Sequence, residues 1–178
     1  MRKTSAVIGC RLFFKVFLSS WCLSPVKCLA ATLADDCWRS GFGVNGVSGD
    51  VYATVTHASG NLYVGGQFEV AGYVVVNNIA KWDGSSWCAL GTGMDNVVRV
   101  LAVSGNDLYA GGAFTQAGGV AANYIAKWNG TSWSVLGTGM AGGGHGPYGP
   151  YVYALAVSGS DLYAGGEFSI AGGVTSNH

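Results

Sequence analysis

The segment LYAGGAF at residues 108–114 is one of three closely similar copies in the chain, and this repetition indicates the fold. It appears as LYVGGQF at 62–68 and as LYAGGEF at 162–168, at spacings of 46 and then 54 residues. Self-similarity at a period of roughly 20–50 residues is typical of architectures in which each copy forms one supersecondary unit. An insertion at 142–150 accounts for most of the difference between the two spacings.

The residues around this segment repeat as well. IAKWDG at 79–84 returns as IAKWNG at 125–130, and LGTGM at 90–94 returns as LGTGM at 136–140. In the second copy the pattern predicts four strands, at 97–103, 108–114, 124–128 and 133–136, with a tight two-residue hairpin at Asn129-Gly130. No segment shows a sustained helical period. With 30 glycines, 12% aromatic and 10% charged residues, the composition favours many short strands joined by turns.

The residue pattern of each copy resembles the kelch repeat. A double glycine closes the second strand, one tryptophan precedes the hairpin turn and another lies on the fourth strand. The residues in these structural positions are Gly65, Gly66, Trp82 and Trp87, then Gly111, Gly112, Trp128 and Trp133, then Gly165 and Gly166. The variant found here is similar to repeats of secreted bacterial proteins and of a fungal cell-surface polarity family. The resemblance covers about residues 38–174 and departs from the standard repeat in a shorter third hairpin.

The resemblance implies an all-β fold, a partial β-propeller of four-stranded kelch-like blades with about two and a half blades present. We expect a partial blade at 35–50, blades at 51–94 and 95–140, and a partial blade at 152–178. Closed propellers need about four to eight blades. A partial ring exposes apolar blade faces, so self-association through these edges is one expectation, and a fragment of a larger protein is another.

Residues 1–34 have the pattern of a leader. Basic residues come first, the apolar stretch VFLSSWCL follows at 16–23, and small residues offer cleavage after Ala30 or Ala34. The uncharged run between Lys15 and Lys27 has 11 residues, whereas a membrane-spanning helix needs about 20. We therefore expect a signal peptide, a secreted or cell-surface location and no transmembrane span; whether the leader is cleaved stays open.

The body after residue 30 is acidic, with four basic against nine acidic residues. A body without a basic stripe argues against nucleic acid as a partner. Cys37 and Cys88 would remain after cleavage of the leader. A bridge between them and two buried thiols are both open at this stage.

Strand polarity places the three long connections, at 69–78, 115–123 and 141–150, on one face of the sheets, the long-loop face. Loops carried by a rigid scaffold are the usual place for binding residues. The insertion supplies a candidate ligand loop with His145, Tyr148 and Tyr151. The alternative is a tolerated surface insertion with no ligand.

The sequence shows no catalytic constellation. Its three histidines lie in separate copies, and no metal-ligand or phosphate-loop spacing is present. No catalytic residue, metal ligand or cofactor is therefore predicted. The leading hypothesis is a non-catalytic, exported module that binds a protein or glycan through the long-loop face. The alternatives are a fragment of a larger propeller enzyme, an oxidase or hydrolase whose active site lies elsewhere, and a truncated reading frame without independent function.

Overall fold

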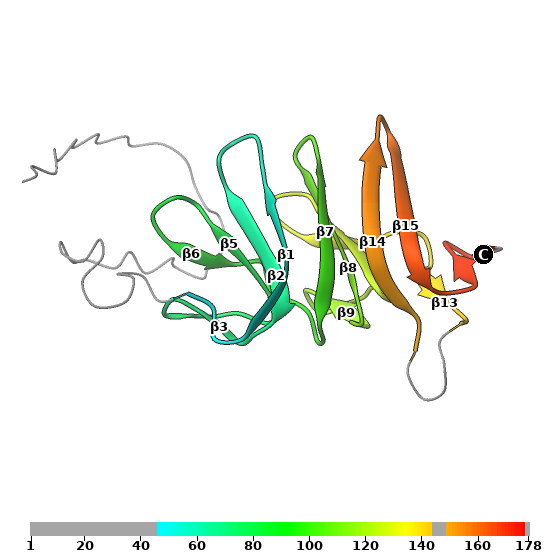
Figure 1. Cartoon of the computed structure of the whole chain (residues 1–178), viewed down its shortest axis with the longest axis horizontal. Helices are drawn as coiled ribbons and strands as arrows, with labels where there is room; N and C mark the ends of the chain where they lie inside the picture. The colour runs from blue at the N-terminus through cyan, green and yellow to red at the C-terminus, as the bar shows by residue number, and fades with distance from the viewer. Residues whose placement is uncertain (1–45, 144–148, 177–178) are drawn as a thin grey trace, which may run out of the picture.

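The computed structural model describes residues 46–143 and 149–176. This part of the chain is all-β, with several small antiparallel sheets and no helix. The sheets stand side by side along the long axis of the molecule, and no sheet among the described residues closes on itself (Figure 1). The predicted leader, Cys37, the partial blade at 35–50 except its last five residues, His145 and Tyr148 all lie outside the described residues.

Two four-stranded sheets have the same strand order. In each sheet the first two strands form a long hairpin, the third strand pairs with the second, and the fourth strand pairs with the third. The first sheet consists of β1 (Asp50–Thr56), β2 (Leu62–Gln67), β5 (Ile79–Trp82) and β6 (Trp87–Ala89). The second consists of β7 (Val98–Ser104), β8 (Asp107–Gly112), β11 (Ile125–Trp128) and β12 (Trp133–Val135). The four strands predicted in the second copy are confirmed.

A third long hairpin follows, formed by β14 (Tyr151–Ser158) and β15 (Asp161–Glu167). It packs against the second sheet through β14, as β7 packs against the first sheet. The turns of the three long hairpins lie at the same end of the strands, along the top of the view in Figure 1. The opposite end of the strands carries the connections between sheets.

The connections predicted as loops at 69–78 and 115–123 contain short strands, which corrects the prediction. Their hairpins are β3 (Val70–Ala71) with β4 (Val74–Val75), and β9 (Gln116–Ala117) with β10 (Val120–Ala121). In the third copy, β13 (Met140–Ala141), β16 (Ile170–Ala171) and β17 (Val174–Thr175) form a three-stranded sheet. Strands of two residues are too short for an alternating pattern, so the sequence gives no signal for them.

These small hairpins also tie each sheet to the chain that enters it. Val47 forms a bridge with Ala71, and Met94 forms the equivalent bridge with Ala117. Asp95 strengthens the second connection, since its carboxylate accepts hydrogen bonds from the backbone of Thr115 (2.8 Å) and Gln116 (2.9 Å). The two connections at 69–78 and 115–123 on the long-loop face are therefore ordered by pairing rather than formed as open loops.

The hairpin predicted at Asn129-Gly130 is present, but the predicted turn type is wrong. Trp128 pairs with Trp133, which leaves four residues in the turn. Gly130 has a φ of 99°, whereas Asn129 is not among the residues with positive φ. The Asn129 side chain instead accepts the N–H groups of Thr131 and Ser132, both at 2.9 Å. Such capping by an Asn side chain stabilises a turn without positive φ at that residue.

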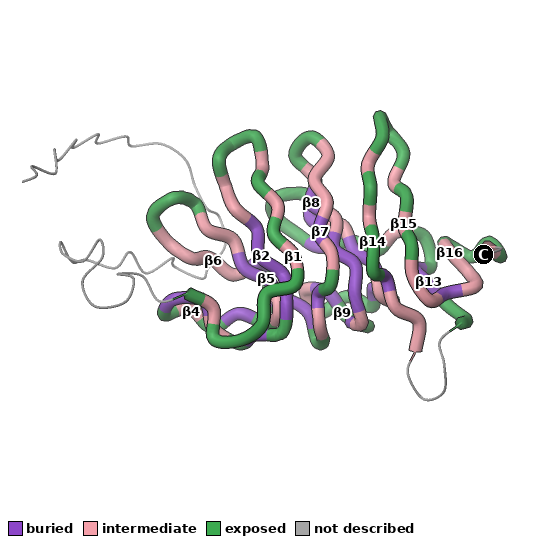
Figure 2. The backbone as a smooth tube through the Cα atoms, viewed as in Figure 1, coloured by how far each residue is buried: buried purple, intermediate pink, exposed green. Residues whose placement is uncertain are grey.

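The core lies between the sheets. Its largest fully buried side chains include Phe114, Ile79, Leu90, Met94 and Val98, contributed by the first and second sheets and the segments that join them. Figure 2 shows the buried segments gathered around β7 and β8, with exposed backbone at the hairpin turns. Packing between sheets is thus the main source of hydrophobic stabilisation.

Tryptophans and glycines determine how closely the sheets approach. Trp128 and Trp133 pack with ring centroids 5.3 Å apart, and the indole N–H of Trp133 donates to the Leu90 carbonyl of the first sheet's edge at 2.8 Å. Gly65 faces Val98 so closely that a Cβ there would lie 2.5 Å from its Cγ1. Gly111 faces Val152 in the same way, at 2.6 Å. Glycine is required at these two positions because any side chain would push the sheets apart.

Candidate functional site

An arginine surrounded by three tyrosine rings lies on the exposed side of the first strands. The Arg99 guanidinium carbon is 5.8 Å from the ring centroid of Tyr52, 5.6 Å from that of Tyr151 and 5.5 Å from that of Tyr153. All three distances are within cation–π range. We call these four residues the Arg99 cluster; it joins β1, β7 and β14, which belong to three successive hairpins.

A β-bulge explains why these side chains leave the core. The pairing of each first strand shifts register at one residue: Tyr52 in β1, Arg99 in β7 and Tyr153 in β14. A bulged residue is unpaired and its side chain is re-aimed relative to its neighbours. The valines just before the bulge in β7 and β14, Val98 and Val152, are fully buried, whereas Arg99, Tyr52 and Tyr153 are exposed.

Two carboxylates flank the cluster. The Tyr52 hydroxyl donates to Asp50 at 3.3 Å, and the Glu167 carboxylate lies close enough to Tyr153 for its charge to act on the pKa of that hydroxyl. Desolvation first, and then the charge of Glu167, raise the pKa of Tyr153 above its usual value of 10.0, although the positive charge of Arg99 acts in the opposite direction. Hydrogen-bond acceptors thus lie on both sides of the guanidinium.

Arg99 itself has no carboxylate partner among the described residues. The position equivalent to Glu167 in the second sheet is Ala113, whose N–H donates to the carbonyl of Val97. A guanidinium held over aromatic faces keeps its N–H donors in the ring plane available. Within the described part of the chain, Arg99 is therefore a positioned cation whose hydrogen-bond donors have no carboxylate partner.

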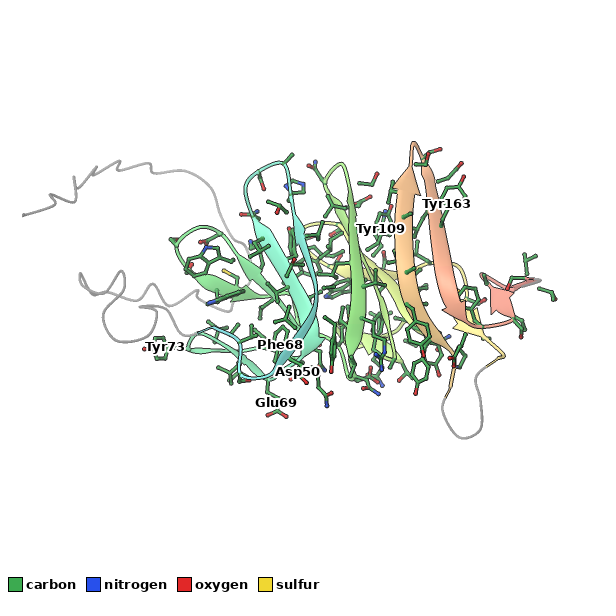
Figure 3. The ribbon with its side chains drawn as sticks, viewed as in Figure 1. Asp50, Phe68, Glu69, Tyr73, Tyr109 and Tyr163 are labelled. Atoms are coloured by element: carbon green, nitrogen blue, oxygen red, sulfur yellow. The ribbon has the colours of Figure 1, made fainter. Side chains whose placement is uncertain are left out.

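A hollow of about 950 Å³ lies at the end of the strands that carries the connections between sheets. It is formed between the connections of the first and second sheets. Its lining includes Val97 and Gln67, which are close in the chain and sheet to Arg99 and Asp50, respectively. Figure 3 labels Asp50, Phe68 and Glu69 at this end, where the first strand begins and the second ends. The Arg99 cluster and the hollow therefore share the long-loop face.

Most polar groups of the hollow serve the backbone. The Asp95 carboxylate holds Thr115 through its N–H and its hydroxyl, the latter at 2.6 Å. Asn77 donates to the Thr92 carbonyl at 2.7 Å, and Asn78 donates to the Met94 carbonyl at 3.0 Å. These side chains order the rim of the hollow and are not available as nucleophile or base.

The described residues contain no cluster of three or more His, Cys, Asp or Glu side chains that could hold a metal ion. His57 lies at the opposite end of the sheets, where Nδ1 contacts Ser59 Oγ at 2.7 Å and Nε2 contacts the Gly105 carbonyl at 2.8 Å. It joins the turns of two hairpins. The described part of the chain also contains no helix long and apolar enough to cross a bilayer.

Of the three predicted ligand-loop residues, Tyr151 is described. It is the first residue of β14 and supplies one ring of the Arg99 cluster. The sequence reasoning missed Tyr52, Arg99 and Tyr153. Their signal was available: VYA at 51–53, VRV at 98–100 and VYA at 152–154 each place one large polar side chain in an apolar strand at the same position of the copy.

No family model, curated protein or solved structure matches this chain. The kelch-like resemblance consequently rests on the repeated motifs alone, and the site must be judged by its own geometry.

Proposed function

We propose that this chain is a non-catalytic, exported binding module of the β-propeller type, which recognises a glycan through the Arg99 cluster on its long-loop face. The propeller interpretation is supported by two four-stranded sheets of identical strand order that pack side by side. Export is supported by the leader-like pattern of residues 1–34.

The observation that carries the binding function is the arrangement of Arg99 between tyrosine rings and carboxylates. Sugar hydroxyls both donate and accept hydrogen bonds. Asp50 and Glu167 offer acceptors, and Arg99 offers donors in a fixed fork. Tyr52 and Tyr153 are 47% and 44% exposed, so their rings present apolar area beside these polar groups. Apolar area with a few placed polar groups is the usual composition of a ligand site.

A protein is the second candidate ligand, because tyrosine and arginine are also enriched at protein interfaces. Both candidates need the same cluster, so one set of variants tests both. The open shape of the surface and the mixture of donors and acceptors around one cation favour the glycan.

The test is a glycan array probed with the full chain, together with the Arg99→Ala variant. Loss of the guanidinium should weaken binding about tenfold or more, as at other central arginine contacts. A second variant, Ala113→Glu, keeps Arg99 but gives it a carboxylate at the position of Glu167, and should weaken the same interactions. Lys81→Ala, which removes a cation from β5 outside the cluster, is the matched control.

An array profile that is identical for the unmodified chain and Arg99→Ala would refute the proposed site. Binding to no glycan, combined with Arg99-dependent capture of a defined protein, would reassign the ligand class to protein. Variants must first be shown to unfold at the unmodified protein's denaturant midpoint, so that lost binding is not lost folding.

A further inference from the structure

Neighbouring sheets meet through one recurring contact, which we call the valine–glycine seat. The valine before the bulge of a first strand enters the space above a glycine on the second strand of the preceding sheet. Val98 enters over Gly65, and Val152 enters over Gly111. Both valines are fully buried, and both glycines are buried as well. The seat is formed twice within the described chain.

Each outer face of the stack carries one half of the same seat. Gly165, equivalent to Gly65 and Gly111, is exposed, and a Cβ there would meet only the Cβ of Ala154, at 3.6 Å. Val51, equivalent to Val98 and Val152, is 44% exposed. Among residues 46–143 and 149–176, the last sheet thus has a glycine without a valine, and the first sheet has a valine without a glycine.

The tyrosine two residues before the glycine shows the same contrast. Tyr63, beside a neighbouring sheet, is 6% exposed, whereas Tyr163 on the last hairpin is 58% exposed. Figure 3 labels Tyr163 and its equivalent Tyr109, which lies on β8 with the next hairpin beside it. An aromatic side chain that is buried in the first copy is left exposed in the last, as at an interface without its partner.

We propose that a second copy of this chain occupies the exposed face, with Val51 of one copy seated over Gly165 of the other. The structure favours a second copy because the two unpartnered faces are the two halves of a contact that the chain already forms between its own sheets. The association is head-to-tail, so it forms a ring if the rotation between copies closes and an open filament if it does not. This proposal does not depend on what the Arg99 cluster binds.

The seat between copies is weaker than the two within the chain. The first sheet has Thr54 and Thr56 where the second has Leu101 and Val103, and both threonines are exposed. Less apolar area is therefore buried, and the hydrophobic contribution falls in proportion. We expect reversible association that increases with protein concentration.

The test is light scattering of the full chain over a concentration series, with variants at both halves of the seat. Gly165→Ala adds a methyl group for which the single chain has room, and Val51→Asp places a charge on an exposed position. Each should lower the association constant about tenfold or more. Val174→Ser is the control. It removes an apolar side chain that is 71% exposed from the end of the stack that carries Gly165, and Val174 is not part of the seat.

Mixing the two variants separates this proposal from unspecific association. Gly165→Ala keeps a functional Val51, and Val51→Asp keeps a functional Gly165, so a mixture should form one-to-one dimers that grow no further. A full chain that stays monomeric at every concentration would overturn the proposal. In that case the two faces are either covered by other residues of the same chain or left uncovered. An equal effect of Val174→Ser and Gly165→Ala, or a mixture that remains monomeric, would overturn the proposal as well.

Discussion

Replacing Gly111 with alanine should destabilise the fold, whereas the same change at Gly165 should not. A Cβ at Gly111 would lie 2.6 Å from Cγ1 of Val152 and 2.9 Å from Cγ1 of Val100, so the sheets must separate or the valines must leave their rotamers. A Cβ at Gly165 would have its nearest neighbour at 3.6 Å, which is ordinary contact. Neither glycine has positive φ, so backbone strain does not contribute to the difference.

The expected magnitudes follow from these distances. Adding a methyl group to a packed core typically costs about 1–3 kcal/mol. At an unhindered position, replacing glycine with alanine stabilises by about 0.4–1 kcal/mol, because the unfolded chain loses freedom. Gly111→Ala should therefore lower the free energy of unfolding by about 1–3 kcal/mol, and Gly165→Ala should leave it unchanged or raise it slightly.

The assay is urea unfolding followed by tryptophan fluorescence, at a protein concentration low enough to keep the chain monomeric. The midpoint should fall for Gly111→Ala with an unchanged slope. Val152→Ala provides a second measure: in the Gly111→Ala background it should cost less than in the unmodified protein, because the added methyl group takes the vacated space. Coupling of at least about 0.5 kcal/mol is expected for such direct contacts. Equal effects at Gly111 and Gly165, or no coupling, would refute the packing argument.

Three further predictions concern side-chain hydrogen bonds. Burial opposes ionisation of Asp83, but hydrogen bonds from Ser85 and Ser86 outweigh this effect and lower the pKa of the carboxyl group. The ionised carboxylate therefore stabilises the fold above pH 3.8, and this stabilisation is lost as the pH falls through the lowered pKa. Asp83→Asn, which copies Asn129, should make acid unfolding below pH 3.8 less steep, because the side chain at 83 then has no proton to take up. Trp133→Phe should lower the unfolding free energy by about 0.5–1.5 kcal/mol, because it removes a buried hydrogen bond to the Leu90 carbonyl, which keeps only the longer bond from the Gly93 N–H (3.2 Å). Asp95→Ala should accelerate amide hydrogen exchange at 115–116, since both N–H groups donate to its carboxylate; unchanged exchange would contradict its anchoring role.

The sequence predicted the long strands well because they carry redundant signals. The segment at 108–114 combines an apolar run, a double glycine and a preceding turn, and β8 (Asp107–Gly112) lies there. The small hairpins were missed because two residues cannot show a period. The turn at Asn129 was mistaken because its Asn-Gly pair also suits a two-residue turn, whereas the Trp128–Trp133 pairing fixes a loop of four residues. Cross-strand register is a tertiary property that a single strand's sequence does not contain.

The candidate site was harder to predict, because its residues occupy positions at which the three copies of the repeat differ from one another. At the packing positions the copies agree: glycine at 65, 111 and 165. At the bulge they read Tyr52, Arg99 and Tyr153, and at the end of the second strand they read glutamine, alanine and glutamate. Only the pairing across each hairpin shows that these two variable positions are neighbours at one end of the sheets.

The proximity of the bulge residue to the end of the second strand explains why the second sheet supplies the cation of the cluster. In the third hairpin the charge of Glu167 acts on the bulge residue Tyr153. The second sheet has Ala113 at the position of Glu167, so no carboxylate of the same hairpin neutralises Arg99, and the rings of the adjacent strands hold it. A glutamate at 113 would form an ion pair with Arg99 and compete with any ligand, as an internal partner lowers the fraction of binding-competent sites. In the proposed site, binding would therefore depend as much on the small residue at 113 as on the arginine, and a search for related sites should look for both together.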